Sequence, residues 1–348
     1  MSSIQEVAKN AGVSTATVSR TFNMPGLLKH ETRERVLQAA DLLNYRPRRR
    51  LAKGGNNGVR REEINGCLGF LFFASETDSD QVNTFYASVL MGAQEEASRI
   101  GVDMFVRTLP RRQKYQQLPD IFRDQSVAGL LLVGAATAPI LKAASSQTTT
   151  AVLIDNQISD CPLDSVISDS FGGVKAAMRH LIDLGHRKIG FVLNEPTAPS
   201  FQDRLHGYIC AHYDSGLVPN KNWILMAHCN EIVEPMMIEM LRSDDRPTAI
   251  IAANDMNAFS VMSACRQTGL SIPDDISLIG FDDIPFSVHS YPPLTTMAVN
   301  KQHLGRLAVR QLQQRIFERT NSNAPAEPPV QITVPVSLIQ RGTCRSIT

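Results

Sequence analysis

Ile4-Gln-Glu-Val-Ala-Lys-Asn-Ala-Gly-Val-Ser-Thr-Ala-Thr-Val-Ser-Arg20 predicts two short helices joined by a tight turn. The apolar residues of the first helix recur at spacings of three and four, at Ile4, Val7, Ala8 and Ala11. Ser3 and Glu6 have the spacing of a capping box at its start. Gly12 can adopt the left-handed backbone that ends this helix, and the Ser14 hydroxyl can cap the next one.

The second helix, which begins at Thr15, turns Val18 inward and short, mostly polar side chains outward. The outward residues are Thr15, Ala16, Thr17, Ser19 and Arg20. A third helix over 32–43 closes the small core with the stripe Val36, Leu37, Ala40 and Leu43. A short helix face that ends in one arginine suits the major groove of DNA. A three-helix bundle without DNA affinity is the alternative.

The charge of the chain is divided unevenly. Residues 1–63 hold 12 of the 35 Lys and Arg residues but only 6 of the 34 Asp and Glu residues, a net charge of +6 against −5 for the rest. Such asymmetry is expected when one end of a protein meets phosphates. It favours DNA binding over a plain bundle.

A dense set of head residues matches a known pattern: Val7-Ala8, Ala11-Gly12-Val13-Ser14, Thr17-Val18-Ser19-Arg20, Asn23, Thr32-Arg33, Val36, Leu43-Asn44-Tyr45 and Pro47. This helix-turn-helix head resembles that of the lactose-repressor/galactose-repressor family of bacterial transcription regulators, and the likeness continues more sparsely along the chain. With the helix pattern, it implies a set of DNA-contacting residues. They are Ser3, Gln5, Ser14, Thr15, Ala16, Thr17, Ser19, Arg20, Asn23, Tyr45, Arg48, Arg49, Arg50 and Leu51.

Residues 48–65 predict a basic linker between the head, 1–47, and a larger core. The run 48–50 is three arginines, which can contact phosphates of any sequence, and the glycines and asparagines of 54–58 favour a flexible chain. A solvated tether without DNA contacts is the alternative. In the family, this segment forms a hinge helix that pushes a leucine into the minor groove. Here Leu51 comes earlier after Pro47 than in the family, so weaker DNA bending is expected.

The composition is that of a globular protein with more than one domain. Its 348 residues are 43% hydrophobic and 20% charged. The cysteines are scattered, with no Cys-x-x-Cys pair and no histidine cluster at zinc spacing. We therefore expect the cysteines to be reduced and to serve as packing residues, and we expect no metal or other cofactor. There is no apolar signal region and no run of ~18 apolar residues, which predicts a cytoplasmic location.

Beyond Ile64, short apolar strands alternate with helical patterns. The expected strands are 67–73, 103–107, 129–133, 151–154, 165–168, 188–193, 224–227, 249–253 and 277–281. The expected helices are 85–100, 173–184, 201–213, 232–241, 254–268 and 301–319. This alternation predicts an α/β core, 66–340, of two doubly wound parallel-sheet subdomains. The expected division is 66–168 with 298–325, 169–297 with 326–340, and a C-terminal tail, 341–348.

Polar residues follow several of the expected strands, where doubly wound sheets bind small molecules. They are Asp155, Asp169, Asn254-Asp255 and Asp282-Asp283. Each residue taken singly can equally well be a helix cap or a turn residue. Their convergence predicts a pocket whose carboxylates accept hydrogen bonds from ligand hydroxyl groups.

The core also carries segments similar to those of the family: Asn83-Thr-Phe-Tyr86, Arg204-Leu-His-Gly-Tyr208, Asn254-Asp255, Gly280-Phe-Asp-Asp283 and Pro293-Leu-Thr-Thr296. The resemblance implies a periplasmic-binding-protein-like core in which Arg204, Asn254 and Asp282 bind ligand hydroxyls. It also implies that Phe85 and Tyr86 pack against the apolar face of the ligand. Asp155, Asp169 and Phe201 complete the expected effector site.

The function that these features imply is an effector-responsive, sequence-specific DNA-binding regulator, a repressor that senses a sugar or sugar derivative. The alternative is a small-molecule receptor or enzyme with the N-terminal bundle used for assembly. No phosphate-binding loop, nucleophile elbow or His-Glu-x-x-His motif is present, so we expect no enzyme. We expect a homodimer on a pseudo-palindromic operator, with no membrane partner. The apolar stripe of 301–319 either forms part of the dimer seam or packs on its own sheet.

Overall fold

The computed structural model describes the chain outside residues 1–3, 24–29, 44, 46–63, 65, 75–83, 111–126, 135, 137, 147–149, 158–162, 195–197, 228–232, 322–326 and 348. The chain forms two compact units, residues 1–60 and 61–348. No helix within the described ranges is both long and apolar enough to cross a bilayer. The predicted linker lies outside these ranges apart from Ile64, and so does Leu51.

The first unit contains α1 (Ile4–Ala11), α2 (Thr15–Asn23) and α3 (His30–Leu42). Its core consists of Val7, Ala8, Ala11, Val18, Val36, Ala39 and Ala40. Gly12 has a φ of 62°, and the Ser14 hydroxyl accepts a hydrogen bond of 3.1 Å from the Thr17 N–H. The predicted turn and cap between α1 and α2 are therefore confirmed.

The prediction for the third helix was wrong at Leu37, which is 39% exposed. Ala39 is buried in its place. The inward face of α3 follows Val36, Ala39 and Ala40, and Leu43 packs at its end. The small alanine side chains of this face share one buried cluster with residues of α1 and α2.

In the part of the chain that the structure describes, the second unit is built on two six-stranded sheets. The strands of the first sheet are β1 (Cys67–Ala74), β2 (Met104–Pro110), β3 (Val127–Gly134), β4 (Thr150–Ile154), β5 (Asp164–Ser168) and β11 (Gln331–Val334). Their order is β11-β5-β4-β3-β1-β2, and every pair is parallel. We call this sheet and its helices the first half.

The second sheet belongs to the second half of the unit. Its strands are β6 (Ile189–Asn194), β7 (Ile224–Ala227), β8 (Ala249–Ala252), β9 (Ser277–Asp282), β10 (Thr295–Ala298) and β12 (Ser337–Ile339). The order is β12-β10-β9-β8-β6-β7, with only β12 antiparallel to its neighbour. The predicted pair of doubly wound, mostly parallel sheets is therefore confirmed.

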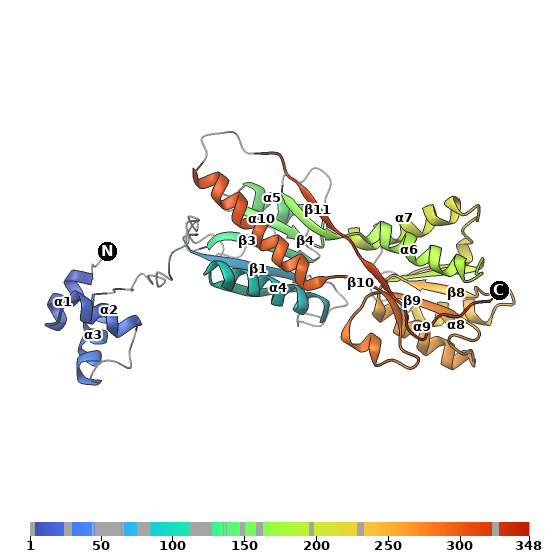
Figure 1. Cartoon of the computed structure of the whole chain (residues 1–348), viewed down its shortest axis with the longest axis horizontal. Helices are drawn as coiled ribbons and strands as arrows, with labels where there is room; N and C mark the ends of the chain where they lie inside the picture. The colour runs from blue at the N-terminus through green and yellow to red at the C-terminus, as the bar shows by residue number, and fades with distance from the viewer. Residues whose placement is uncertain are drawn as a thin grey trace. The chain divides into compact units, whose positions relative to one another are not determined.

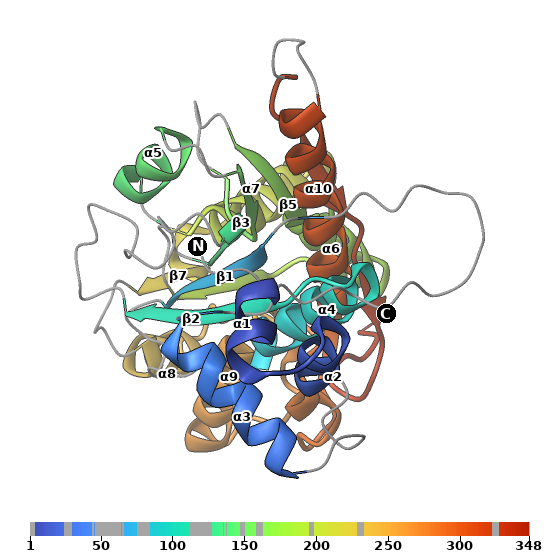
Figure 2. The same ribbon diagram turned by 90° about the vertical axis from the view of Figure 1, so that its left-hand side faces the viewer.

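Helices cover both faces of each sheet (Figure 1). In the first half, α4 (Thr84–Ile100) and α10 (Lys301–Asn321) pack on one face, and α5 (Ala138–Ser146) packs on the other (Figure 2). In the second half, α6 (Ser170–Asp183) and α7 (Pro199–Asp214) cover one face, and α8 (Val233–Arg242) and α9 (Asp255–Thr268) cover the other. This coverage buries all of β1. The short α5 was not predicted.

The chain crosses between the halves three times: from β5 to α6, from β10 to α10 and from β11 to β12 (Figure 1). The expected division of the core differs at the last crossing, because 331–334 pairs with β5 in the first half and 337–339 with β10 in the second. The expected tail also packs. Thr343 is buried, and its hydroxyl donates to the Leu278 carbonyl at 2.6 Å, so this run belongs to the second half.

The apolar stripe of α10 packs within its own chain. Leu304, Ala308, Val309 and Leu312 are all buried in the core cluster. At Gly305, a Cβ atom would lie 2.1 Å from the Val89 carbonyl oxygen, so α10 and α4 touch backbone to backbone. This packing favours the second of the two predicted roles for the stripe.

Candidate functional sites

The face of α2 that was expected to meet DNA is open to solvent. The exposed members of the expected set in the first unit are Gln5, Ser14, Thr15, Ala16 and Arg20, and Thr17 and Ser19 are partly exposed. The hydroxyls of Ser14 and Thr17 lie 2.9 Å apart. Ser14 caps α2 through the Thr17 N–H, and Arg20 is the cation on this face of the helix.

The rest of the expected DNA-contacting residues lie elsewhere. Asn23 ends α2, and Ser3, Arg48–Arg50 and Leu51 lie outside the described residues. Tyr45 is half-buried, packs against the head core, and donates its N–H to the Ala40 carbonyl at 2.8 Å. Tyr45 therefore has a packing role in the head, and its DNA contact stays a prediction.

Asp155 directly follows β4 at the carboxyl end of the first sheet. Its φ of 54° is in the left-handed region, which turns the chain sharply there. The Tyr86 hydroxyl donates to Asp155 Oδ2 at 2.8 Å, whereas Oδ1 is buried with no hydrogen-bond partner among the described residues. Burial raises the pKa of Asp155, opposed by Arg204 and Tyr86. The site therefore has an open acceptor on the first half.

Arg204, on α7 in the second half, is only 2% exposed. It donates to Ser170 Oγ at 3.3 Å, to the Ala253 carbonyl at 2.5 Å and to Asp282 Oδ1 at 3.2 Å. Its guanidinium carbon lies 3.8 Å from the centre of the Phe281 ring, a cation–π arrangement. The predicted meeting of Arg204 and Asp282 is therefore present, and protein groups engage all three guanidinium nitrogens.

Asp282 and Asp283 form a strained turn at the end of β9, with φ values of 108° and 53°. Burial raises the pKa of Asp282 to about 7, against the opposing effects of Arg204 and Lys301. The Asp283 carboxylate accepts a hydrogen bond of 2.7 Å from Arg341. Non-glycine residues in this region of backbone space persist where their surroundings hold them, and they cluster at functional sites.

Two of the expected ligand-binding residues cap helices. Asn254 accepts the Asn257 N–H at 2.8 Å at the start of α9, and Asp169 accepts the Gly172 N–H at 2.8 Å at the start of α6. These contacts match the alternative that the sequence left open for each residue. Ligand contacts by either side chain stay a prediction.

Asp255, beside Asn254, is fully buried and structural. Its carboxylate accepts hydrogen bonds from the Ile284 N–H at 2.9 Å and from the hydroxyls of Ser287 and Thr296, each at 2.6 Å. Burial raises the pKa of Asp255, and these hydrogen bonds oppose the shift. Asp255 ties the loop after β9 and strand β10 to α9.

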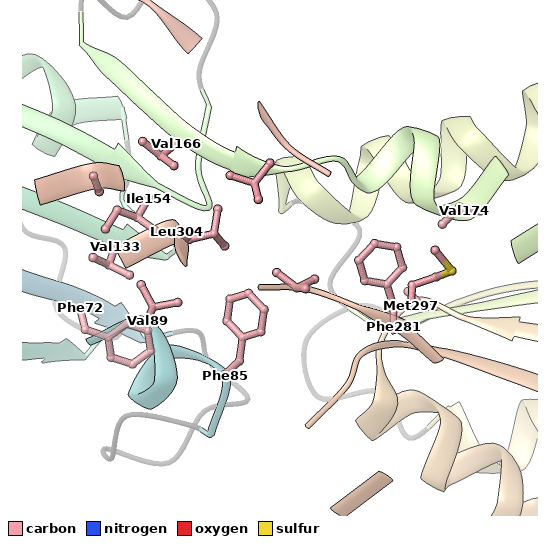
Figure 3. Packing of buried hydrophobic residues seen from close by; sticks show 14 of the residues in the cluster. Phe72, Phe85, Val89, Val133, Ile154, Val166, Val174, Phe281, Met297 and Leu304 are labelled. Carbon is pink, nitrogen blue, oxygen red and sulfur yellow. The ribbon is translucent and has the colours of Figure 1, made fainter. Parts of the chain in front are cut away.

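Aromatic side chains line the same region. Phe85 and Tyr86 begin α4 and pack edge to face with ring centres 5.0 Å apart. Figure 3 shows Phe85 at the edge of the first half, with Phe281 on the facing side. Phe201 of α7 lies 5.2 Å from the Arg204 guanidinium carbon. Tyr86 therefore contacts the Asp155 carboxylate and Phe201 lies beside the arginine that binds Asp282, whereas Phe85 packs on Tyr86 and is largely buried.

Sequence reasoning missed two links around the site. Gln157 of the first half donates to Asp203 Oδ2 of α7 at 2.9 Å, and Lys301 donates to backbone carbonyls at the turn after β9. Gln157 stands near Asp155 in an unpatterned loop and carries no distinguishing signal. Lys301 does carry such a signal in the sequence, because a lysine at the first position of a helix opposes the helix dipole.

Comparisons with known proteins identify the family. Residues 3–48 match the model of the bacterial regulatory proteins of the lacI family, and residues 178–344 match a periplasmic binding protein-like domain. The HTH-type transcriptional repressor PurR of Pasteurella multocida is 31% identical over 347 residues, covering 98% of this chain and 100% of that protein. The chain belongs to the LacI family. The PurR protein of Aliivibrio salmonicida is also 31% identical, over 92% of this chain and 93% of its own.

Solved structures of LacI-family regulators share the fold. The lac repressor dimer bound to operator and the anti-inducer ONPF has a TM-score of 0.71 at 24% identity, covering 99% of both chains. The complex of the regulator CelR with cellobiose has a TM-score of 0.67 at 23% identity, covering 99% of this chain and 100% of that one. This LacI-family chain is thus a ligand-responsive, DNA-binding transcription regulator with a helix-turn-helix head and a periplasmic-binding-protein-like core.

Proposed function

We propose that this regulator is a repressor whose operator affinity is set by a sugar or sugar derivative bound between the halves of its core. The observation that carries the proposal is a pair of carboxylates at strand ends of different halves: Asp282 is bound by Arg204, and Asp155 keeps a buried oxygen without a partner among the described residues. Carboxylates that meet at strand ends accept hydrogen bonds from ligand hydroxyls. The CelR complex with cellobiose provides a sugar-bound example of the fold.

The chemistry of the site favours an uncharged ligand rich in donors. Each nitrogen of the Arg204 guanidinium already donates to a protein acceptor, and the Lys301 ammonium donates to backbone carbonyls. In contrast, Asp155 Oδ1 is buried without a partner among the described residues. A phosphate would bring negative charge beside two carboxylates, whereas sugar hydroxyls supply the missing donor.

The test uses the full chain in two steps. Duplexes selected from a random library should yield a pseudo-palindromic operator, because a dimer presents two heads to DNA. D-ribose, D-glucose, cellobiose, ribose 5-phosphate and adenine should then be compared by thermal shift and by their effect on the selected duplex. A sugar at ~100 times its dissociation constant should stabilise the core by about 2.7 kcal/mol. A response only to ribose 5-phosphate or adenine would replace the sugar in the proposal.

In the head, Arg20→Ala should flatten the preference among variants of the selected duplex by ~1–3 kcal/mol, because Arg20 is the exposed cation of α2. Arg35→Ala on α3 is the matched control, since it removes the same charge from an exposed helical position. The control should weaken all duplexes alike. Competition assays at several salt concentrations measure both effects, and full retention of preference by Arg20→Ala would refute the base contact.

We further propose that the loop after β9 forms part of a homodimer seam. Met256 on α9 and Phe286, Val288 and Tyr291 of this loop are apolar side chains that are each more than half exposed. Asp255 holds the loop against α9 through Ile284 and Ser287. A second copy of the chain is the proposed occupant, supported by the dimeric lac repressor of the same fold.

Phe286→Asp combined with Tyr291→Asp should convert the dimer to a monomer at micromolar concentration, because two buried charges would face each other across a symmetric interface. Sedimentation equilibrium measures the change. Val218→Asp, at an exposed apolar position of the same half, is the control and should stay dimeric. A double variant that remains dimeric would move the seam elsewhere.

A further inference from the structure

Lys301 occupies an electrostatically unfavourable position. It is the first residue of α10, where the chain re-enters the first half from β10. The N-terminus of a helix carries partial positive charge and favours anions, yet the first turn of α10 has no acidic residue. Partial burial lowers the pKa of Lys301, and the carboxylates of Asp282, Asp283 and Asp255 oppose that shift. The helix dipole and burial both disfavour the charged ammonium of Lys301. Strong contacts are therefore needed to stabilise it there.

Backbone carbonyls supply that compensation. The Lys301 ammonium donates to the carbonyl of Asp282, to that of Asp283 at 3.0 Å and to that of Val299 at 3.3 Å. The first two acceptors belong to the strained turn after β9. The third belongs to the segment that crosses from β10 to α10. One ammonium therefore joins the turn, the crossing segment and the first turn of α10.

Two other cations hold the side chains of the same turn. Arg204 binds the Asp282 carboxylate, and Arg341 binds that of Asp283. Lys301 binds the backbone carbonyls of both residues. These contacts surround two residues with positive φ, and strained backbone persists only where its surroundings hold it. We therefore expect a change at one carboxylate to move the carbonyls beside it.

The other two crossings are joined differently. The Asp169 N–H donates to the Val334 carbonyl at 2.9 Å, which links the crossing from β5 with the crossing from β11. The crossing from β10 has a longer backbone contact to the turn, from the Val299 N–H to the Asp282 carbonyl at 3.4 Å. The side chain of Lys301 therefore adds the contacts that fasten this crossing to Asp282 and Asp283.

We infer that Lys301 is a positioning residue that transmits the state of the Asp282 carboxylate to the crossing between β10 and α10. A ligand that engages Asp282 competes with Arg204, shifts the turn, and moves the segment 299–304 through the Lys301 ammonium. The inference concerns how the proposed effector site acts on the arrangement of the halves, and so it rests on the proposed function.

A double-mutant cycle tests this coupling without ligand or DNA. Asp282→Asn removes the carboxylate charge, Lys301→Met removes the ammonium, and amide hydrogen exchange of residues 299–304 in the full chain is the measured quantity. Asp282→Asn should speed exchange about tenfold in the parent protein, because the Lys301 ammonium, bonded to the carbonyls of Asp282 and Asp283, passes the change in the turn to this segment. In the Lys301→Met background, Asp282→Asn should change the exchange of residues 299–304 by less than about twofold.

The matched control is Lys175→Met, which removes a partly exposed lysine paired with Asp214 in the second half. The effect of Asp282→Asn should persist in that background. Equal effects of Asp282→Asn with and without Lys301 would make the lysine a purely structural residue and overturn the inference. If Lys301→Met does not fold, Lys301→Gln replaces it, and failure of both variants to fold also overturns it.

The double-mutant cycle tests the role of Lys301, and the ligand panel tests the proposed effector, so the two can fail independently. A lost coupling in the cycle, alongside a normal sugar response, contradicts only the role of Lys301. Coupling in the cycle without any sugar response supports Lys301 and contradicts the proposed effector.

Discussion

Replacement of Arg204 by alanine is expected to destabilise the second unit by ~3–5 kcal/mol, because it leaves the buried Asp282 carboxylate without its cation. The change also removes the hydrogen bonds to Ser170 and the Ala253 carbonyl and the stacking on Phe281. Urea unfolding measures the loss. Trp223 is the only tryptophan of the chain and lies in the second half, so its fluorescence reports on this unit.

The same variant should weaken effector binding by ~10–100-fold where it remains folded, since the charged group that holds the Asp282 carboxylate in place is lost from the site. Operator affinity without effector should stay within a few fold, because the head is a separate compact unit. Calorimetry with the sugar selected by the panel measures the first effect, and a titrated duplex shift measures the second.

Arg266→Ala on the exposed surface of α9 is the control for loss of an arginine and should change stability by less than ~0.5 kcal/mol. An Arg204→Ala protein as stable as this control would show that Asp282 tolerates burial alone. Unchanged sugar affinity in both Arg204→Ala and Asp282→Ala would place the effector elsewhere.

Asp255→Ala is expected to cost ~3–9 kcal/mol of stability in the second unit, since three donors lose their acceptor and each buried unpaired group costs ~1–3 kcal/mol. The affected donors are the Ile284 N–H and the hydroxyls of Ser287 and Thr296. Release of Ile284 and Ser287 also frees the loop proposed for the dimer seam. The fluorescence of Trp223 in urea and the dimer dissociation constant should therefore change together.

Asp244→Ala, at an exposed position after α8, is the control for removal of an aspartate and should leave both quantities unchanged. Asp255→Asn should retain more stability than Asp255→Ala, because the amide oxygen can still accept one or two of the three hydrogen bonds. A stable Asp255→Ala protein with an unchanged dimer constant would contradict the anchoring role of this carboxylate.

Local chemistry explains why much of the fold could be predicted. The glycine at 12 and the serine at 14 define the turn of the head through backbone freedom and a side-chain cap, both of which depend only on neighbouring residues. The apolar run 67–74 predicts a strand buried on both faces. The covering helices follow from the spacing of apolar residues in 85–100 and 301–319. Short or weakly patterned elements, such as α5, carried too little of this signal.

The candidate site could be predicted only in part. Strand ends located Asp155 and Asp282, and the family resemblance singled out Arg204. The distances between them depend on how the halves pack. Asn254 and Asp255 are neighbours in sequence with different roles, since one caps α9 at its start and the other is enclosed by the loop after β9 and by β10. No local pattern distinguishes the two.

By itself, the sequence determined the helix-turn-helix head, the uneven charge, the alternation of strands and helices and the family, because these depend on spacing and composition. Tertiary structure alone decided that α10 packs on α4, that 331–334 joins the first sheet, and that Lys301 binds the turn at Asp282 and Asp283. Each of these contacts joins segments far apart in the chain. Their energies come from close packing and from burial of charge, which exist only once the halves have folded together.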